Sequence, residues 1–137
     1  ARLTMTDRIM GMQWTMKDIL DQDIARMLGE AEKALSNSEF FRLGDSFRIL
    51  ADDSDVTRRI FQNFPKENVY SSGLAKIRIQ VPEQNRADVV SYVTEILHRN
   101  GIDLVDALFS RDGIVLILKA DQAPIAYEKL RSEIPRQ

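Results

Sequence analysis

The sequence contains no cysteine and only one histidine among its 137 residues. The absence of cysteine excludes disulfide bonds and thiolate chemistry, and it is typical of proteins that work in a reducing compartment. A single histidine cannot supply the cluster of nitrogen and sulfur ligands that a zinc-type site needs. We therefore expect no disulfide and no metal site, and a cytoplasmic location.

Long apolar runs and one-sided charge are also missing. No apolar run approaches the ~20 residues that a membrane-spanning helix needs, so we expect no membrane partner. The net charge is −2, and the 19 basic residues are scattered along the chain. Because phosphate binding depends on clustered positive charge, we expect these residues to contact no nucleic acid.

The groups that carry catalysis are isolated in this sequence. His98 lies near the end of a predicted helix, where a histidine interacts favourably with the helix dipole. The acidic run Asp52–Asp55 lacks the glycine and the distal glutamate of a calcium loop, so we expect it to cap a helix. No P-loop, GxGxxG or GxSxG motif is present. We therefore predict that these residues are not an enzyme and hold no cofactor.

The second half of the chain has the clearest pattern. Apolar residues alternate with polar ones over 74–81, which predicts a strand with one buried face. Over 87–100 the apolar residues fall on one stripe of a helix, which Asn100-Gly101 ends. Arg111-Asp112-Gly113 predicts a hairpin between strands 102–109 and 114–119.

A second helix is predicted at 122–134. Asp121 is expected to cap it, Pro124 suits its first turn, and Pro135 ends it. The resulting order, strand–helix–strand–strand–helix, is most of a ferredoxin-like unit. The last strand of that unit is either absent or supplied from elsewhere.

The first half repeats this order less clearly. Leu3 and Met5 alternate with threonines, and we expect a strand that continues past a bend at Asp7-Arg8. Thr15 and Asp18 resemble a capping box for a helix. The remaining predicted elements are helix 16–36, strands 39–44 and 46–51, helix 54–64, which Pro65 closes, and strand 68–71.

The two halves therefore predict an internal repeat of about 70 residues. Ile49–Asp53 falls opposite Ile117–Asp121, and each segment runs from a strand into a helix. The expected fold is α+β, with two ferredoxin-like (βαββαβ) modules in tandem. Each module would have an antiparallel sheet with helices on one face. We expect module 1 at residues 1–72, the more divergent one, and module 2 at residues 73–137.

Ile114–Leu118 is apolar at every position. A strand that is apolar on both faces is normally covered on both, whereas the helices of one module cover one face only. The sister repeat or a second chain would cover the other face, and a homodimer is expected. The alternative is a central strand with an exposed apolar face.

These patterns resemble the ACT domain, a small ligand-binding regulatory module of amino-acid metabolism. The similarity rests on Ile77–Val81, on Glu95–Asp106 (EILHRNGIDLVD), on Val115–Leu130 (VLILKADQAPIAYEKL) and, more weakly, on Phe47–Phe61 (FRILADDSDVTRRIF). The whole chain is similar to tandem ACT regulators of archaea and to the ACT pair of aspartate kinases. The resemblance implies an allosteric regulatory module that binds an amino acid at an interface between modules.

The resemblance also implies where that ligand binds, between the first strand and the first helix of a module. Free N–H groups at a helix N-terminus attract a carboxylate. The corresponding ligand-binding candidates are Glu83, Gln84, Asn85, Arg86, Ala87, Asp88, Ile102 and Asp103. Arg86 would hold a carboxylate, and Glu83, Asn85 or Asp88 an amino group. In the first repeat the matching segment is Gly11–Asp18, where Met12 and Trp14 are expected to fill the core or an interface.

The sequence departs from the family at this point, because no glycine lies between Gly73 and Gly101 and the family's Pro-Gly is absent. Without glycine the backbone approaches a ligand less easily. Three alternatives remain open: a solvated loop with Asn85 or Asp88 capping the helix, a dimerisation module that binds no ligand, and the effector domain of a longer DNA-binding regulator or enzyme.

Overall fold

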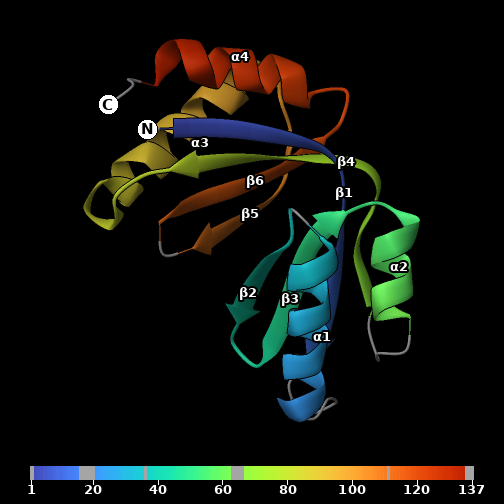
Figure 1. Cartoon of the computed structure of the whole chain (residues 1–137). Helices are drawn as coiled ribbons and strands as arrows, with labels where there is room; N and C mark the ends of the chain where they lie inside the picture. The colour runs from blue at the N-terminus through green and yellow to red at the C-terminus, as the bar shows by residue number, and fades with distance from the viewer. Residues whose placement is uncertain (1, 16–20, 36, 63–66, 111, 135–137) are drawn as a thin grey trace. The chain divides into compact units, whose positions relative to one another are not determined.

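The computed structural model describes residues 2–15, 21–35, 37–62, 67–110 and 112–134 (Figure 1). These residues form an α+β structure that divides into two compact units. We call Arg8–Ser72 the continuous unit, and Ala1–Asp7 with Gly73–Gln137 the split unit. The chain passes from the continuous unit to the split unit between residues 72 and 73, and residues 1–7 lie in the split unit with the second half of the chain.

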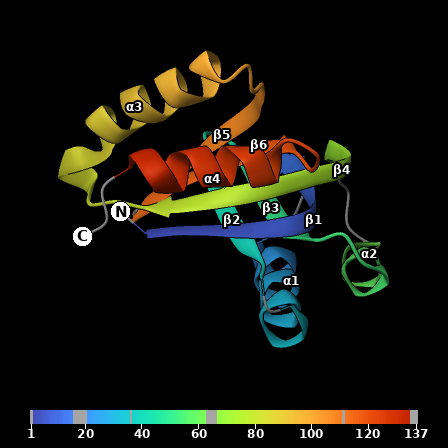
Figure 2. The ribbon, with the colours of Figure 1, turned by 90° about the horizontal axis from the view of Figure 1, so that it is seen from above.

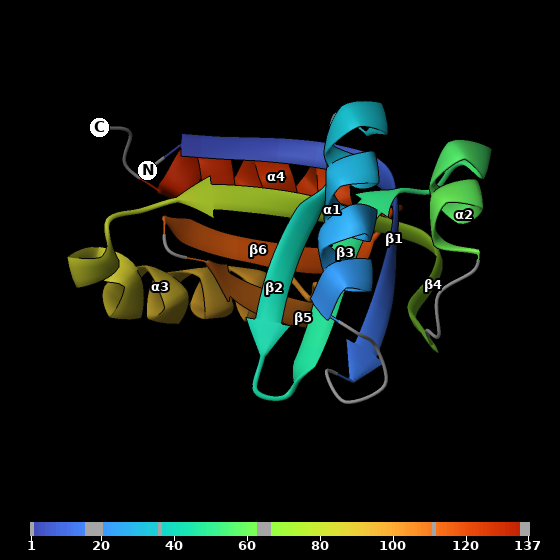
Figure 3. The ribbon, with the colours of Figure 1, turned by 60° about the horizontal axis from the view of Figure 1, so that its bottom comes forward.

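The split unit contains the pattern that is clearest in the sequence. Its elements are the start of β1 (Arg2–Thr15), most of β4 (Glu67–Gln80), α3 (Arg86–Arg99), β5 (Leu104–Ser110), β6 (Gly113–Lys119) and α4 (Ala123–Glu133). Their strand order is β1-β4-β6-β5. Figures 2 and 3 show β1 along the side of β4. The strand that the second half lacks is therefore supplied by the first residues of the chain.

The core of the split unit lies between one face of this sheet and the two helices. Alternate residues of β4 and β6, such as Ile77 and Leu116, pair across the ladder and point to this face. They pack with the apolar stripes of α3 and α4, which include Ile96 and Leu130. Leu3 of β1 packs against the same core, although it comes from the other end of the sequence.

β6 is buried on both faces. It lies between β4 and β5 in the strand order, and all residues from Gly113 to Leu118 are buried. Leu116 faces the helices, whereas Val115 and Ile117 point the other way and are 0% exposed. The prediction of an inner strand covered front and back is confirmed, and the alternative of an exposed apolar face is wrong.

The continuous unit has the strand order β2-β3-β1-β4. Its elements are the rest of β1, α1 (Asp21–Ala34), β2 (Glu39–Leu43), β3 (Ser46–Asp52), α2 (Asp55–Phe61) and the start of β4. Met12 and Trp14 are buried in its core, as expected, and the Trp14 ring lies 5.7 Å from that of Phe61. Trp14 is the only tryptophan, so its fluorescence reports on this unit.

Two left-handed residues mark where the chain passes from one unit to the other. Arg8 has φ 52° and Gly73 has φ 84°, so the predicted bend at Asp7-Arg8 is confirmed. The Arg8 carbonyl accepts the Asp53 N–H at 2.7 Å, and the Gly73 carbonyl accepts the Ala120 N–H at 2.8 Å. Asp53 follows β3 and Ala120 follows β6, so each carbonyl binds the residue after a strand of its own unit.

These two hydrogen bonds shift the alignment of the two repeats by one residue at the ends of β3 and β6. The sequence pattern places Asp53 opposite Asp121, but the hydrogen bonds make Asp53 equivalent to Ala120. The reason is that two residues connect β3 to α2, whereas three connect β6 to α4. When the two halves are aligned by their apolar pattern, the starts of α2 and α4 coincide, but the ends of β3 and β6 are offset by one residue.

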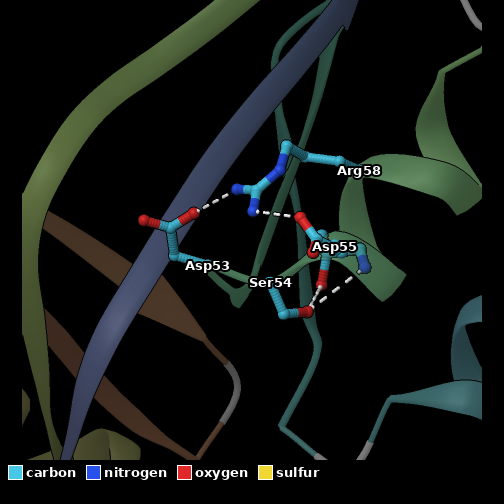
Figure 4. A network of polar contacts seen from close by, with 5 residues as sticks. Asp53, Ser54, Asp55 and Arg58 are labelled. Atoms are coloured by element: carbon cyan, nitrogen blue, oxygen red, sulfur yellow. Dashed lines mark hydrogen bonds and ion pairs between the residues drawn. The ribbon is translucent and has the colours of Figure 1, made fainter.

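The helix caps agree only in part with the predictions. Ser54 caps α2 by accepting the Thr57 N–H at 3.3 Å, and Arg58 binds Asp53 and Asp55 at 2.6 and 2.8 Å (Figure 4). At α4 the cap position is held by Gln122 rather than Asp121, without a side-chain cap, although Pro124 lies in the first turn as predicted. The predicted boundary residues Asp18, Pro65 and Pro135 lie outside the described residues.

In the described part of the chain, no group of histidine, cysteine, aspartate and glutamate side chains is arranged to hold a metal ion. Within the same residues, no helix combines the length and the apolar character needed to cross a membrane.

Candidate functional site

The connection from β4 to α3 carries most of the predicted ligand-binding residues. A single 3-10 turn at Glu83–Asn85 leads into α3, and the Asn85 N–H donates to the Pro82 carbonyl at 2.9 Å. Asn85 occupies the cap position of α3, but its side chain makes no cap hydrogen bond. Capping by the Asn85 side chain is therefore wrong, while capping by Asp88 stays a prediction.

Most of the side chains in this segment face solvent. Gln84, Ala87 and Asp88 are exposed, and Asn85 and Arg86 are half-buried. The side chain of Glu83 lies outside the described residues. Asp88 lies in the first turn of α3, where its negative charge interacts favourably with the helix dipole.

Arg86 binds the protein itself. Its guanidinium donates to the Ser110 carbonyl at 2.5 Å, which joins the start of α3 to the end of β5. A guanidinium carries five N–H donors in a planar fork. The bond to the Ser110 carbonyl thus positions the guanidinium at the start of α3.

A polar network holds the neighbouring β5–β6 turn. Asp112 accepts a hydrogen bond from the Ser110 hydroxyl at 3.1 Å and from the Arg78 guanidinium at 2.8 Å. Its carbonyl accepts the Val81 N–H at 3.0 Å, which links the turn to the end of β4. The Ser110 hydroxyl first, and the Arg78 charge next, lower the pKa of the Asp112 carboxyl below its ordinary value of 3.8.

This lowered pKa leads to a prediction for Ser110→Ala. Loss of the hydroxyl donor should raise the pKa of Asp112 toward 3.8 and reduce stability by about 0.5 kcal/mol, a small value because Asp112 is exposed. A carboxyl with a depressed folded-state pKa stabilises fully above 3.8 and loses that contribution as the pH falls through its folded-state pKa. The difference between the wild type and Ser110→Ala should therefore shrink in acid, where the other hydrogen bond of this hydroxyl, to the Gly113 carbonyl at 3.3 Å, remains.

NMR titration of the Asp112 carboxyl measures the pKa directly, and urea unfolding at neutral and acid pH measures the stability. Thr94→Ala is the matched control, since Thr94 also donates its hydroxyl to the protein but to the carbonyl of Val90 on α3. An unchanged Asp112 pKa in Ser110→Ala would contradict the assigned hydrogen bond.

The last two candidates lie at the other end of α3. Ile102 is buried in the core, and its N–H donates to the Leu97 carbonyl at 2.9 Å, whereas Asp103 is exposed. The 14 residues of α3 separate the two groups by ~21 Å along the helix axis. One copy of the unit therefore brings residues 84–88 together but does not unite them with Asp103.

Sequence reasoning missed two features of this region. The first is the Ser110–Asp112–Arg78 network, for which the hairpin motif was the only signal. The second is the position of β5 at the edge of the split unit's sheet. Leu104, Val105 and Phe109 of this strand are exposed apolar side chains, and Phe109 is 50% exposed. An exposed apolar edge strand is a surface on which another strand can pair.

Comparisons with known proteins place this geometry in a structural context. No protein-family profile matches the sequence, and no curated protein matches it. Among solved structures, the regulatory subunit of aspartate kinase from Thermus thermophilus, in its ligand-free form, matches with a TM-score of 0.61 at 10% identity. That match covers 98% of this chain and 99% of the subunit.

Two other structures match comparably. A C-terminal regulatory domain described for aspartate kinase of Porphyromonas gingivalis matches with a TM-score of 0.66 at 10% identity, over 98% of this chain and 97% of that domain. Escherichia coli aspartokinase III in complex with aspartate and ADP matches with a TM-score of 0.66 at 13% identity, over 96% of this chain.

The matches differ in how much of the other protein they cover. This chain spans about a third of E. coli aspartokinase III and of the aspartate kinase of Clostridium acetobutylicum, 33% in each case. It spans nearly all of the separate regulatory subunit and of the regulatory domain. The chain thus has the α+β fold of the regulatory parts of aspartate kinases.

Proposed function

We propose that this chain is a pair of ACT-like regulatory modules that binds an amino acid and performs no catalysis itself. The observation that carries the proposal is the match to aspartate kinase regulatory parts over almost their whole length. E. coli aspartokinase III has been solved in complex with lysine and aspartate, and that structure also has this fold. We place the function in the cytoplasm, in the control of amino-acid metabolism.

The proposed ligand site lies between two copies of the chain. Because Arg86 and Asp103 lie at opposite ends of α3, an antiparallel pair of β5 strands would bring the Ser110 end of one copy beside the Leu104 end of the other. That pairing places Arg86 of one copy near Asp103 of its partner. The exposed apolar residues of β5 support this interface.

The chemical groups at the two ends of α3 suit an amino acid. Arg86 and the start of α3, where Asn85 makes no side-chain cap bond, would bind the α-carboxylate, and Asp103 would bind the α-amino group. A ligand held by both copies stabilises the pair over the separate chains, since it binds one state only. Regulation would follow from this shift.

A screen of the twenty amino acids tests the proposal. A ligand present at 100 times its Kd should stabilise the folded state by about 2.7 kcal/mol, which thermal unfolding detects as a raised Tm. Asp103→Asn should abolish the shift, while Asp45→Asn, an exposed carboxylate on the turn between β2 and β3, should leave it unchanged. Absence of a shift with every amino acid would contradict ligand sensing.

A substitution in β5 tests the interface separately. Val105→Lys should convert a dimer into a monomer, because it places a charge on the apolar edge, and it should change stability little since Val105 is 44% exposed. Ile125→Lys is the control, as Ile125 is equally apolar and 56% exposed but lies on α4. Light scattering measures the molar mass; a Val105→Lys variant that stays dimeric would refute the β5 interface.

A second candidate is an assembly module that binds no ligand. The observation that favours it is the engagement of Arg86 by the Ser110 carbonyl, in a segment where no glycine eases the approach of a ligand. This candidate predicts a dimer through β5 without any response to amino acids. Because the chain spans 33% of two aspartate kinase chains, either role could be exercised as the effector part of a longer protein.

A further inference from the structure

Two exposed apolar side chains of β5 point to the face of the sheet that carries α3. Phe109 pairs with Ile114, and Leu104 pairs with Leu118, in the ladder between β5 and β6. Residues that pair in an antiparallel ladder point to the same face, and Ile114 and Leu118 belong to the core under the helices. Phe109 and Leu104 therefore lie on the helix face, although they stay 50% and 39% exposed at the sheet edge.

These two side chains flank the proposed ligand site. The Arg86 guanidinium donates to the carbonyl of Ser110, the residue that follows Phe109. Leu104 follows Asp103, which carries the carboxylate of the site. In the proposed antiparallel pair of β5 strands, Phe109 of one copy comes near Leu104 of the second copy. Apolar surface would thus lie beneath the space between Arg86 and Asp103 of the second copy.

The neighbouring carboxylates face other directions. Asp88 lines a hollow together with Ile134 at the end of α4, so its carboxylate faces α4 and not β5. Asp106 pairs with Ile117, which points to the sheet face opposite the helices, and its carboxylate accepts the Ala107 N–H at 2.8 Å. Neither carboxylate is directed at the space above Phe109, where it could neutralise a cationic ligand side chain.

Two basic side chains near the ends of β5 are also directed elsewhere. Arg78 is paired with Asp112 at 2.8 Å. Lys119 follows Leu118 and therefore points to the opposite face of the sheet. His98, which is exposed in the last turn of α3, lies nearer the Asp103 end. Acidic amino acids are therefore among the ligands to be compared.

We propose that the ligand is an amino acid with an aliphatic side chain, such as leucine. This inference rests on the proposed function, in which Arg86 of one copy and Asp103 of the other hold the α-carboxylate and the α-amino group. The ligand side chain contacts the Phe109 ring of one copy and Leu104 of the other. An apolar side chain gains free energy by leaving water there, whereas a charged one would lose hydration without gaining a partner.

Calorimetric titration of the full chain with matched amino acids tests the proposal. Asparagine has the branched shape of leucine but is polar, and lysine is norleucine with an added ammonium group. Leucine should bind about tenfold more tightly than asparagine, and norleucine about tenfold more tightly than lysine. Aspartate and glutamate should bind more weakly than leucine.

Phe109→Ala tests the contact itself. The ratio of the alanine Kd to the leucine Kd should fall about threefold to tenfold, because only leucine reaches the Phe109 ring. Any weakening of the β5 pair would affect both ligands alike and would cancel in this ratio. Leu104→Ala should lower the ratio in the same direction. Ile125→Ala is the control, since Ile125 is 56% exposed on α4, and it should leave the ratio unchanged.

The possible failures are distinguishable. If no amino acid binds, the proposed function and this inference both fail. If an amino acid binds and Asp103→Asn abolishes its binding, but lysine, asparagine or aspartate binds as tightly as leucine, the proposed function stands and the apolar contact is refuted. Equal weakening of leucine and alanine in Phe109→Ala would also refute the contact.

Discussion

Gly113→Ala is expected to lower the free energy of unfolding by about 2–4 kcal/mol. A Cβ atom at Gly113 would lie 2.2 Å from the carbonyl oxygen of Ile79 and 3.2 Å from the Cα of Gln80. Both are backbone atoms of β4, and Gly113 pairs with Gln80 in the ladder between β4 and β6. No side-chain rotation can relieve this overlap, so the two central strands must separate.

Gly29→Ala provides the matched control. Gly29 lies inside α1, and apart from the nearby backbone of its own helix nothing lies within 4 Å of a Cβ added there. Because glycine in a helix interior is unfavourable, alanine should raise stability by about 0.5–1 kcal/mol. The two substitutions are chemically identical and should have opposite signs.

Urea unfolding followed by circular dichroism measures both effects. Trp14 fluorescence adds a signal from the continuous unit alone, and coincident transitions would show that the two units unfold together. If Gly113→Ala were as stable as the wild type, the close approach of β6 to Ile79 would be wrong.

The elements of the split unit were predictable because their signals are local. The apolar stripe of α3, the glycine that ends it at φ 67° and the turn before Gly113 are each encoded within a few residues. The doubly apolar β6 also predicted its own burial. These features depend on periodicity, which one sequence displays in full.

The sheet that residues 2–7 join was not predictable in the same way. Alternation at Leu3 and Met5 indicates a strand, but it does not say which sheet the strand joins. That choice depends on the long-range pairing of β1 with β4 and on the left-handed turns at Arg8 and Gly73. A non-glycine residue with positive φ, such as Arg8, carries little sequence signal.

The candidate site shows the same limit. The segment 84–88 was identified through a family resemblance, but the pattern could not show that Arg86 binds the Ser110 carbonyl. Nor could it show that β5 is an edge strand, since its apolar residues resemble those of an inner strand. Both facts depend on contacts between elements that lie far apart in the sequence.

The burial of β6 on two faces makes a second strong prediction, for two adjacent residues. Leu116→Ala should cost about 2–5 kcal/mol of unfolding free energy because it opens a cavity under α3 and α4, and Ile117→Ala should cost a similar amount. Leu116 is 2% exposed and Ile117 is 0% exposed, although they point to opposite faces of the sheet.

Equal losses of unfolding free energy at these two positions distinguish an inner strand from a strand with one exposed face. A strand covered only by its helices would lose stability at Leu116 and little at Ile117, because the removed methyl groups would already be hydrated. Val105→Ala sets the scale for an exposed position on the neighbouring strand, and it should cost less than about 1 kcal/mol. Urea unfolding of the three variants decides the matter: if Ile117→Ala resembles Val105→Ala, the second face of β6 is open in solution.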